Sequence, residues 1–199
     1  MVFTPSDAVD YSSASATVSL TVNKVTPTVL LTSSANPTVY GGSVTFTAQT
    51  AASATGTMTF YDGAAIIGTG TLSGGVATFT VNSLGAGTHS ITASYPGDSN
   101  YLSAVSAAVS QIVTRAPVTI TVTSSLNPSS FGQSVTFTFT VAGVSGLATP
   151  TGTIAFSDGS TLLASPTLNA FGVATYTTVM LLGGSHTLSA VYGGDANYQ

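Results

Sequence analysis

The 199-residue sequence contains no cysteine, no tryptophan and no glutamate, and Lys24 and Arg115 are its only basic residues. Charged residues make up 4% of the chain, against about 25% in an ordinary soluble protein. Without cysteine the chain has no disulfide framework, no thiol nucleophile and no zinc–thiolate site. With two basic residues and a net charge of −4, it cannot neutralise a nucleic-acid backbone or bind an anionic membrane through a basic patch.

Long hydrophobic segments are also missing. The longest candidate, residues 101–113, is interrupted by serines and falls short of the roughly 18 apolar residues of a spanning helix. We therefore expect no membrane insertion. The first five residues lack the basic and apolar regions of a signal peptide, so we expect the chain to be the interior of a longer protein or a processed product.

The sequence is rich in hydroxyl groups and in apolar residues. Hydrophobic residues form 43% of the chain, and 35 threonines and 28 serines supply most of its polar groups. This apolar content is sufficient for a folded core and argues against disorder. The threonines occupy the polar positions of segments that alternate with period two, as in residues 43–48. That alternation predicts β-strands whose threonines face outward.

The chain repeats itself. Residues 33–37 (SSANP) recur as 124–128 (SSLNP), and residues 97–101 (GDSNY) recur as 194–198 (GDANY). The first offset is 91 and the second is 97, so the second copy has gained residues, five of them around 142–149. A unit of about 90 residues is the size of one small β-sandwich domain.

Glycine and Asx turns separate the alternating segments at the spacing of a sandwich. We predict an all-β fold of tandem immunoglobulin-like β-sandwich domains, with about seven antiparallel strands in each domain. Residues 25–115 form a complete domain, residues 116–199 a domain that lacks its last strand, and residues 1–24 the last strand of an upstream repeat or a donor strand. The strands predicted for the complete domain are 28–33, 43–49, 56–61, 64–71, 76–81, 88–95 and 105–113.

The linkers are short and contain proline, which restricts the backbone and predicts stiff junctions. Lys24 and Arg115 both lie at these junctions. Each basic side chain either pairs with an aspartate in a turn of the neighbouring domain or is simply exposed. The second interpretation is favoured, because surface pairs contribute little.

Residues 14–23 have the pattern of a last strand but no domain of their own. Val18, Leu20 and Val22 alternate with polar residues and would face inward if this strand completed a sandwich. One molecule could therefore donate its N-terminal strand to the C-terminal domain of the next, a non-closing contact that builds a fibre. Alternatively, the boundaries of the chain are arbitrary points in a long repeat protein.

Groups able to carry chemistry are few: six aspartates and two histidines. His89 and His186 occupy equivalent repeat positions with inward parity, which favours a structural histidine bonded to a loop. The Asp98 and Asp195 loops favour tight turns over calcium sites, since calcium takes six to eight oxygen ligands. We therefore predict no catalytic residues, no cofactor-binding residues and no metal ligands, and we expect the protein not to be an enzyme.

Several motifs together resemble bacterial Ig-like domain repeats of large secreted and surface proteins. They cover most of residues 25–199: Asn-Pro, Tyr-Gly-x-Ser-Val-Thr-Phe-Thr, Gly-Thr-x-Thr-Phe-x-Asp-Gly, Gly-Thr-His-Ser-Ile and Tyr-x-Gly-Asp-x-Asn-Tyr. The resemblance implies a stalk or spacer module, displayed outside the cell in long arrays, without catalytic residues. The second copy departs from the pattern in its inserted hairpin and its missing last strand.

Three functions follow as expectations. The first is a non-enzymatic stalk, spacer or adhesin shaft of an extracellular or cell-surface protein, with neighbouring Ig-like repeats as its partners. The second is a filament subunit that forms a homopolymer by strand exchange. The third is a glycan- or protein-binding module that uses exposed loops such as 142–149.

Overall fold

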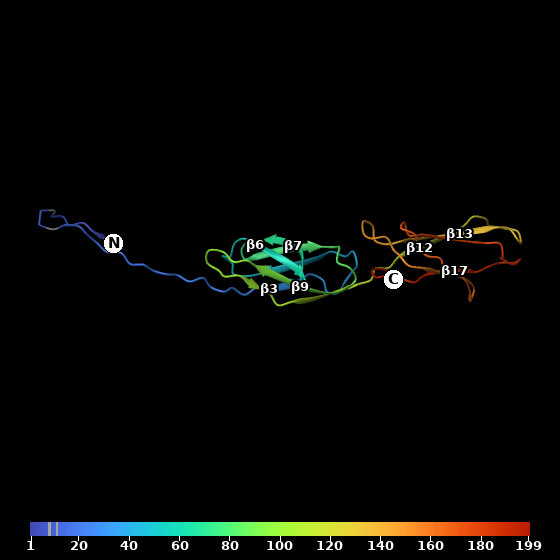
Figure 1. The fold of residues 1–199 in the computed structure, drawn as a ribbon, viewed down its shortest axis with the longest axis horizontal. Helices are drawn as coiled ribbons and strands as arrows, with labels where there is room; N and C mark the ends of the chain where they lie inside the picture. The colour runs from blue at the N-terminus through green and yellow to red at the C-terminus, as the bar shows by residue number, and fades with distance from the viewer. Residues whose placement is uncertain (8, 11) are drawn as a thin grey trace.

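The structure, a computed structural model, describes residues 1–7, 9–10 and 12–199. Two β-sandwiches follow one another along the chain, and an extended N-terminal segment precedes them (Figure 1). The described residues form strands and no helix, and none of their segments is a helix able to span a bilayer. The predicted all-β tandem of immunoglobulin-like sandwiches is confirmed.

We refer to residues 25–115 as domain 1; its strands form two sheets packed face to face. One sheet has the order β3 (Leu30–Ser33), β5 (Val44–Gln49), β8 (Val76–Val81). The other has the order β4 (Thr38–Val39), β11 (Val109–Thr114), β9 (Gly87–Tyr95), β6 (Thr57–Asp62), β7 (Ala65–Thr71), with β10 (Ala104–Val105) also paired to β9. The β4–β11 pair is parallel, and the other pairs are antiparallel.

The alternation read from the sequence decides which side chains fill the space between these sheets. In β5, Phe46 is fully buried while its threonine neighbours are partly exposed at the outer surface. Burial of such aromatic and aliphatic side chains is the main favourable contribution to folding. The residues of this core with no exposed surface are Phe46, Ala48, Met58, Phe60, Ile91, Ala93 and Tyr95.

The last strand of domain 1 differs from the prediction. Residues 105–113 do not form one strand, because the pairing with β9 is interrupted between β10 and β11. Ser106 lies in this interruption, where its buried Oγ accepts a hydrogen bond from the backbone N–H of Ala93 at 3.0 Å. The hydroxyl thus serves as the acceptor for Ala93 at this point, and the N–H of Ser106 donates to the carbonyl of Ala93 at 2.9 Å. The two-residue strand β4 was not predicted either.

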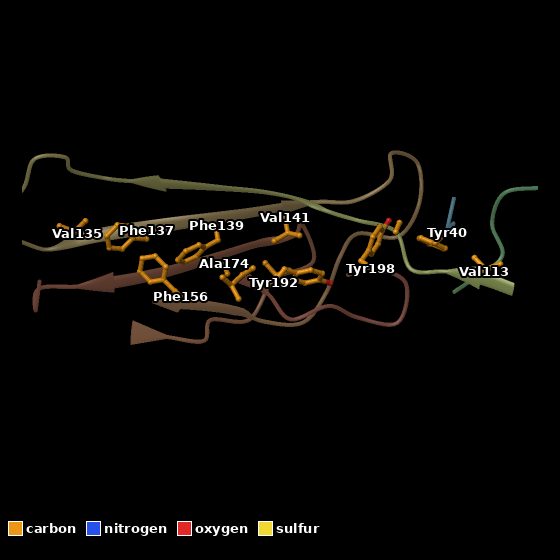
Figure 2. Packing of buried hydrophobic residues seen from close by; sticks show 13 residues of the cluster. Tyr40, Val113, Val135, Phe137, Phe139, Val141, Phe156, Ala174, Tyr192 and Tyr198 are labelled. Carbon is orange, nitrogen blue, oxygen red and sulfur yellow. The ribbon is translucent and has the colours of Figure 1, made fainter. Parts of the chain in front are cut away.

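Domain 2, residues 116–199, has two three-stranded sheets. Their orders are β12 (Thr119–Ser124), β13 (Val135–Ala142), β16 (Val173–Thr178) and β15 (Thr161–Ala164), β14 (Ile154–Asp158), β17 (Leu188–Tyr192). Phe156 lies at the centre of the core, with the rings of Phe137 and Phe139 at 4.9 and 4.8 Å (Figure 2). Within the described part of the chain β17 pairs with β14 alone, whereas its counterpart β9 also pairs with β10 and β11.

The N-terminal segment forms only a small hairpin of β1 (Val2–Phe3) and β2 (Ala14–Ser15). The strand expected over residues 14–23 is therefore limited to its first two residues, and residues 16–24 have no strand assignment. A strand requires a neighbouring edge for its backbone hydrogen bonds. Residues 16–23 extend away from both sandwiches, so they lack such an edge (Figure 1).

Candidate functional site

The two domains meet at a joint centred on Tyr198. This residue belongs to domain 2 and is fully buried. Its ring meets the ring of Tyr40, from domain 1, at a centroid distance of 5.3 Å and an interplanar angle of 89° (Figure 2). An edge-to-face contact of this kind is favourable beyond the area that it buries. Val113 and Ala116 complete a continuous apolar cluster from one domain to the other.

The insertion of the second copy forms part of this joint. The Tyr198 hydroxyl donates to the carbonyl of Ala148 at 2.8 Å and accepts from the backbone N–H of Val144 at 3.2 Å. Val144 and Leu147 pack against the shared cluster. A Cβ at Gly41 of domain 1 would lie 2.8 Å from Val144 Cγ1 and 2.9 Å from Leu147 Cδ1. The loop considered as a ligand-binding candidate thus lies against domain 1.

Backbone hydrogen bonds fix the linker on the joint. The N–H of Ala116 donates to the carbonyl of Asn197 at 2.9 Å, and the N–H of Gln199 donates to the carbonyl of Ala116 at 2.9 Å. The Asn197 side-chain oxygen accepts from the N–H of Ala86 in domain 1, also at 2.9 Å. Because Ala116 is 1% exposed, the linker is a packed element of the structure and not a free tether.

The opposite end of domain 1 repeats this arrangement around Tyr101. The N–H of Val25 donates to the carbonyl of Asn100 at 3.0 Å, and the N–H of Leu102 donates to the carbonyl of Val25 at 2.9 Å. Lys24 Nζ donates to the backbone carbonyl of Asp98 at 2.6 Å and not to its carboxylate. Within the described part of the chain no second domain packs on Tyr101, which is partly exposed.

Asp98 and Asp195 stabilise the turns that carry these tyrosines. The Asp98 carboxylate accepts hydrogen bonds from the backbone N–H groups of Thr55, Asn100 and Tyr101 at 2.8 to 2.9 Å. These donors, first that of Thr55, hold the pKa of Asp98 well below its usual range. The turn interpretation of both loops is confirmed. Among the described residues no three acidic or histidine side chains gather as a cation site.

Each histidine bridges a hairpin turn and a loop of its own domain. His89 Nδ1 lies 2.6 Å from Asp62 Oδ2, and Nε2 lies 2.9 Å from the carbonyl of Gly85. His186 makes the same contacts with Asp158 and Leu182. A carbonyl oxygen only accepts, so both ring nitrogens donate in the protonated form. Burial lowers the pKa of His89, but the bonds to Gly85 and Asp62 outweigh it and raise the pKa overall.

The loop contact of His89 agrees with the sequence interpretation, whereas its aspartate partner was missed. In the sequence, Asp62 is recognisable only as part of one of the Asx turns. Its position next to Gly63, repeated as Asp158 next to Gly159 in the second copy, was a detectable signal. Two acidic turns and two histidines at matched repeat positions indicate a paired structural role.

A groove opens at the end of domain 2 that lies away from domain 1. It has a volume of about 450 Å³ and occupies the place that corresponds to that of β11 in domain 1. Phe131 at its edge is 77% exposed, whereas its counterpart Tyr40, which packs against Tyr198 in the joint, is 6% exposed. We call this feature the strand groove. The apolar residues that line it are Leu126, Pro128, Phe131, Val135, Phe137, Leu181, Leu182 and Leu188.

The three residues predicted to form a donated strand lie far from this groove. Val18, Leu20 and Val22 are 92%, 85% and 83% exposed. The structure does not bring them to any strand edge, so strand donation stays a prediction. The joint residues Tyr40 and Tyr198 and the Asn197 side chain were not identified from the sequence as functional.

Two solved structures and one family model are similar to this chain. Fibronectin(III)-like modules of CbhA from Clostridium thermocellum share 15% identity, with 85% of this chain and 88% of that chain covered and a TM-score of 0.37. A chimeric titin Z1Z2-Z1Z2 tandem functionalized with a fibronectin peptide shares 14% identity, with 81% and 96% covered and a TM-score of 0.27. No curated protein matches the chain. The model of the bacterial Ig-like domain (group 3) family matches residues 31–114 and again residues 118–199. The chain therefore belongs to the bacterial Ig-like domain family, as two tandem copies of that domain.

Proposed function

We propose that this chain is a non-enzymatic structural module, a stiff spacer in the stalk or shaft of an extracellular or cell-surface bacterial protein. The observation that carries the proposal is the joint around Tyr198. A flexible linker would leave the two domains free to reorient, as is usual for domains that share only a small interface. Here the Tyr40–Tyr198 rings, the hydrogen bond from Ala86 to the Asn197 side chain and the 142–149 loop join the two domains directly. Two backbone hydrogen bonds of Ala116 also hold the linker against domain 2.

The surface chemistry supports an exposed, extracellular setting. Threonine and serine provide its polarity in place of charge. The only two sites for a trypsin-like protease, Lys24 and Arg115, lie at linkers whose following residues are hydrogen bonded to a domain. A chain with few accessible cleavage sites suits an environment that contains proteases.

The roles of the ionisable side chains support the absence of catalysis. Both histidines bridge structural elements, and Asp98 and Asp195 use their carboxylates on backbone N–H groups. General acid–base or nucleophilic chemistry needs such a group within reach of a substrate. Ligand binding through the 142–149 loop has less support, because Val144 and Leu147 contribute to the joint.

The spacer function can be tested by measuring the distance between the domains. Because the chain has no cysteine, spin labels can be placed specifically at Thr71→Cys in domain 1 and Thr161→Cys in domain 2, two exposed positions. We expect a single narrow distance distribution from pulsed electron resonance at low protein concentration. A broad distribution for the unmodified joint would contradict the spacer function.

A matched pair of variants assigns this stiffness to the joint. Tyr40→Ala removes one of the two facing rings and should broaden the distribution. Phe131→Ala changes the equivalent repeat position of domain 2, which faces no domain of this chain, and should leave the distribution unchanged. Equal distributions in both variants would show that the Tyr40–Tyr198 contact does not hold the domains.

A further inference from the structure

We propose that the protonation state of His89 controls the hydrogen bond that joins the two domains. The joint is tight while both ring nitrogens of His89 carry a proton, and it loosens when one proton leaves. The proposal rests on the spacer function, because it concerns the regulation of the same joint. Its basis is a single peptide group of domain 1 that contacts His89 at one end and domain 2 at the other.

The peptide group between Gly85 and Ala86 makes both contacts. Its carbonyl oxygen lies 2.9 Å from His89 Nε2, and its N–H donates to the side-chain oxygen of Asn197 in domain 2, also at 2.9 Å. The two ends belong to one rigid plane, because the peptide bond does not rotate freely. A rotation that moves the carbonyl away from His89 therefore turns the N–H away from Asn197.

The loop around this peptide group is able to move. Residues 82–86 have no strand assignment. Glycine lies on both sides of Ala86, and Gly87 has a φ of +150°, a conformation that favours glycine. Leu84, in the same loop, packs against the hydrophobic cores of both domains. A shift of the loop thus affects the apolar contact of the joint as well as its hydrogen bond.

Both neighbours of the imidazole are hydrogen-bond acceptors. Nδ1 lies 2.6 Å from the Asp62 carboxylate, and Nε2 faces the carbonyl of Gly85. A neutral imidazole has only one N–H, and the charged carboxylate forms the stronger bond with it. Nδ1 therefore keeps the remaining proton, and Nε2 presents a lone pair to the Gly85 oxygen. The two lone pairs repel each other, so the peptide group turns away.

Within domain 1, Asp62 is the charged group that faces the ring of His89. The side chains of His89 and Asp62 are 17% and 27% exposed. Tyr61, the residue before Asp62 in β6, points to the opposite face of the sheet. β11 places Gln111 opposite His89, and neither β11 nor the loop 82–88 contains a titratable residue. The His89 ring therefore responds chiefly to its own proton and to Asp62.

The ionisable groups on the domain 2 side of the joint have other partners. The Asp195 carboxylate accepts from N–H groups of its own turn, and the Tyr198 hydroxyl donates to the carbonyl of Ala148. The guanidinium of Arg115, in the linker, lies beside Gly194. None of these groups is hydrogen bonded to the Gly85–Ala86 peptide, whose contact in domain 2 is the uncharged Asn197 side chain.

The direction of the pH response follows from these contacts. Burial lowers the pKa of His89, but the bonds to Gly85 and Asp62 outweigh it and raise the pKa above the ordinary value of 6.5. The doubly protonated ring and the tight joint therefore predominate below pH 6.5. The joint loosens as the pH rises through the raised pKa.

His186 provides an internal control in the same chain. It makes the same two contacts, with Asp158 at 2.6 Å and with the carbonyl of Leu182 at 2.9 Å. The N–H of that peptide group belongs to Gly183, and no described residue of the chain accepts a hydrogen bond from it. His186 thus has the same chemistry without a connection to the joint.

The first experiment measures the pKa of each histidine by NMR titration of the full chain. Because coupling between two equilibria is reciprocal, a joint that requires protonated His89 must also raise the pKa of His89. We expect Asn197→Ala to lower the pKa of His89 and to leave that of His186 unchanged. Asn100→Ala, at the same repeat position on the other end of domain 1, should change neither. An unchanged pKa of His89 in Asn197→Ala, or an equal shift of both histidines, would overturn the proposal.

The second experiment repeats the distance measurement between spin labels at Thr71→Cys and Thr161→Cys at pH 5 and at pH 8.5. We expect a narrow distribution at pH 5 and an open fraction about fivefold larger at pH 8.5. His89→Gln removes the titrating group and Asn197→Ala removes its connection to domain 2, so both should abolish the pH response. His186→Gln should keep the response.

The outcomes separate the regulation from the spacer function. Distributions that are equally narrow at both pH values would overturn the control by His89 and leave the spacer function intact. Distributions that are equally broad at both pH values would contradict the spacer function and the control together. Loss of the response in His186→Gln would assign it to a change in domain 2 and not to the joint, which would also overturn the proposal.

Discussion

The side-chain oxygen of Asn197 in domain 2 accepts a hydrogen bond from the backbone N–H of Ala86 in domain 1 at 2.9 Å. The adjacent Tyr198 packs its ring on Tyr40. One turn of domain 2 thus makes both the polar and the aromatic contact of the joint. Asp195 positions this turn, because its carboxylate accepts from the N–H groups of Asn197 and Tyr198 at 2.8 Å.

Asn197→Ala should loosen the joint. The change leaves the N–H of Ala86 without its partner, at a cost of about 1 kcal/mol, and should open the joint about fivefold more often. The bond after Arg115 then becomes accessible, so limited trypsin digestion should cut there correspondingly faster. Asn100→Ala is the control, because Asn100 has the same repeat position at the other end of domain 1, where no second domain of the described chain adjoins it. If Asn100→Ala accelerated trypsin cleavage equally, the faster cleavage would not result from opening of the joint.

Tyr198→Phe should destabilise domain 2. The hydroxyl donates to the carbonyl of Ala148 and accepts from the N–H of Val144, and its loss leaves both backbone groups unpaired. We expect the free energy of unfolding to fall by about 1 to 2 kcal/mol in urea titrations. Tyr101→Phe removes a bond to the exposed Ser53 and should change stability by less than about 0.5 kcal/mol. An equal loss in the two variants would contradict the role assigned to the 142–149 loop.

Stability should fall as the pH rises through the raised pKa values of the two histidines. The pKa of His89 is raised above its ordinary value of 6.5, and so is the pKa of His186, mainly through its bond to the carbonyl of Leu182. The stabilisation is fully present below pH 6.5 and is lost as the pH rises through the higher pKa of the folded state. Thermal unfolding from pH 5 to pH 9 should therefore show a decreasing Tm. In the double variant His89→Gln, His186→Gln the Tm should no longer decrease with pH in this way. An unchanged decrease would show that other groups cause it.

Acid should destabilise both domains through Asp98 and Asp195. Backbone donors lower the pKa of Asp98, and the pKa of Asp195 is lowered despite the opposing effect of burial. Their stabilisation is present above the unfolded-state value of 3.8 and is lost as the pH falls through the lower folded-state pKa. Asp98→Ala should lower the Tm of domain 1 at pH 7 and reduce its acid sensitivity below pH 4. Asp7→Ala, in the N-terminal segment, is the control and should change neither.

The strands of domain 1 could be predicted because their alternation is local. Residues such as Phe46 and Ala93 appear every second position, and period two specifies which side faces the core. The interruption at Ser106 and the short strand β4 could not be predicted, because both depend on which edge lies nearby. For the same reason the strand prediction for residues 14–23 was met only at its first two residues. Their pattern is that of a strand, but the rest of the segment has no neighbouring strand edge in the molecule.

The structural roles of the histidines were partly predictable. Their parity placed them at the mouth of each sandwich, and the repeat made this position recur. The partner Asp62 comes from a hairpin 27 residues earlier in the chain, and only the pairing of β6 with β9 brings the two together.

The sequence by itself determined the fold class, the repeat, the absence of thiol chemistry and the scarcity of charge, because composition and short periods act locally. The tertiary structure decided what lies between the domains and at their ends. Tyr40 and Tyr198 belong to different domains and meet only through the packing of one domain on the other, and the insertion at 142–149 gains its role from contacts with Gly41 and Tyr198. Contacts between distant segments depend on the completed packing, which no local pattern encodes.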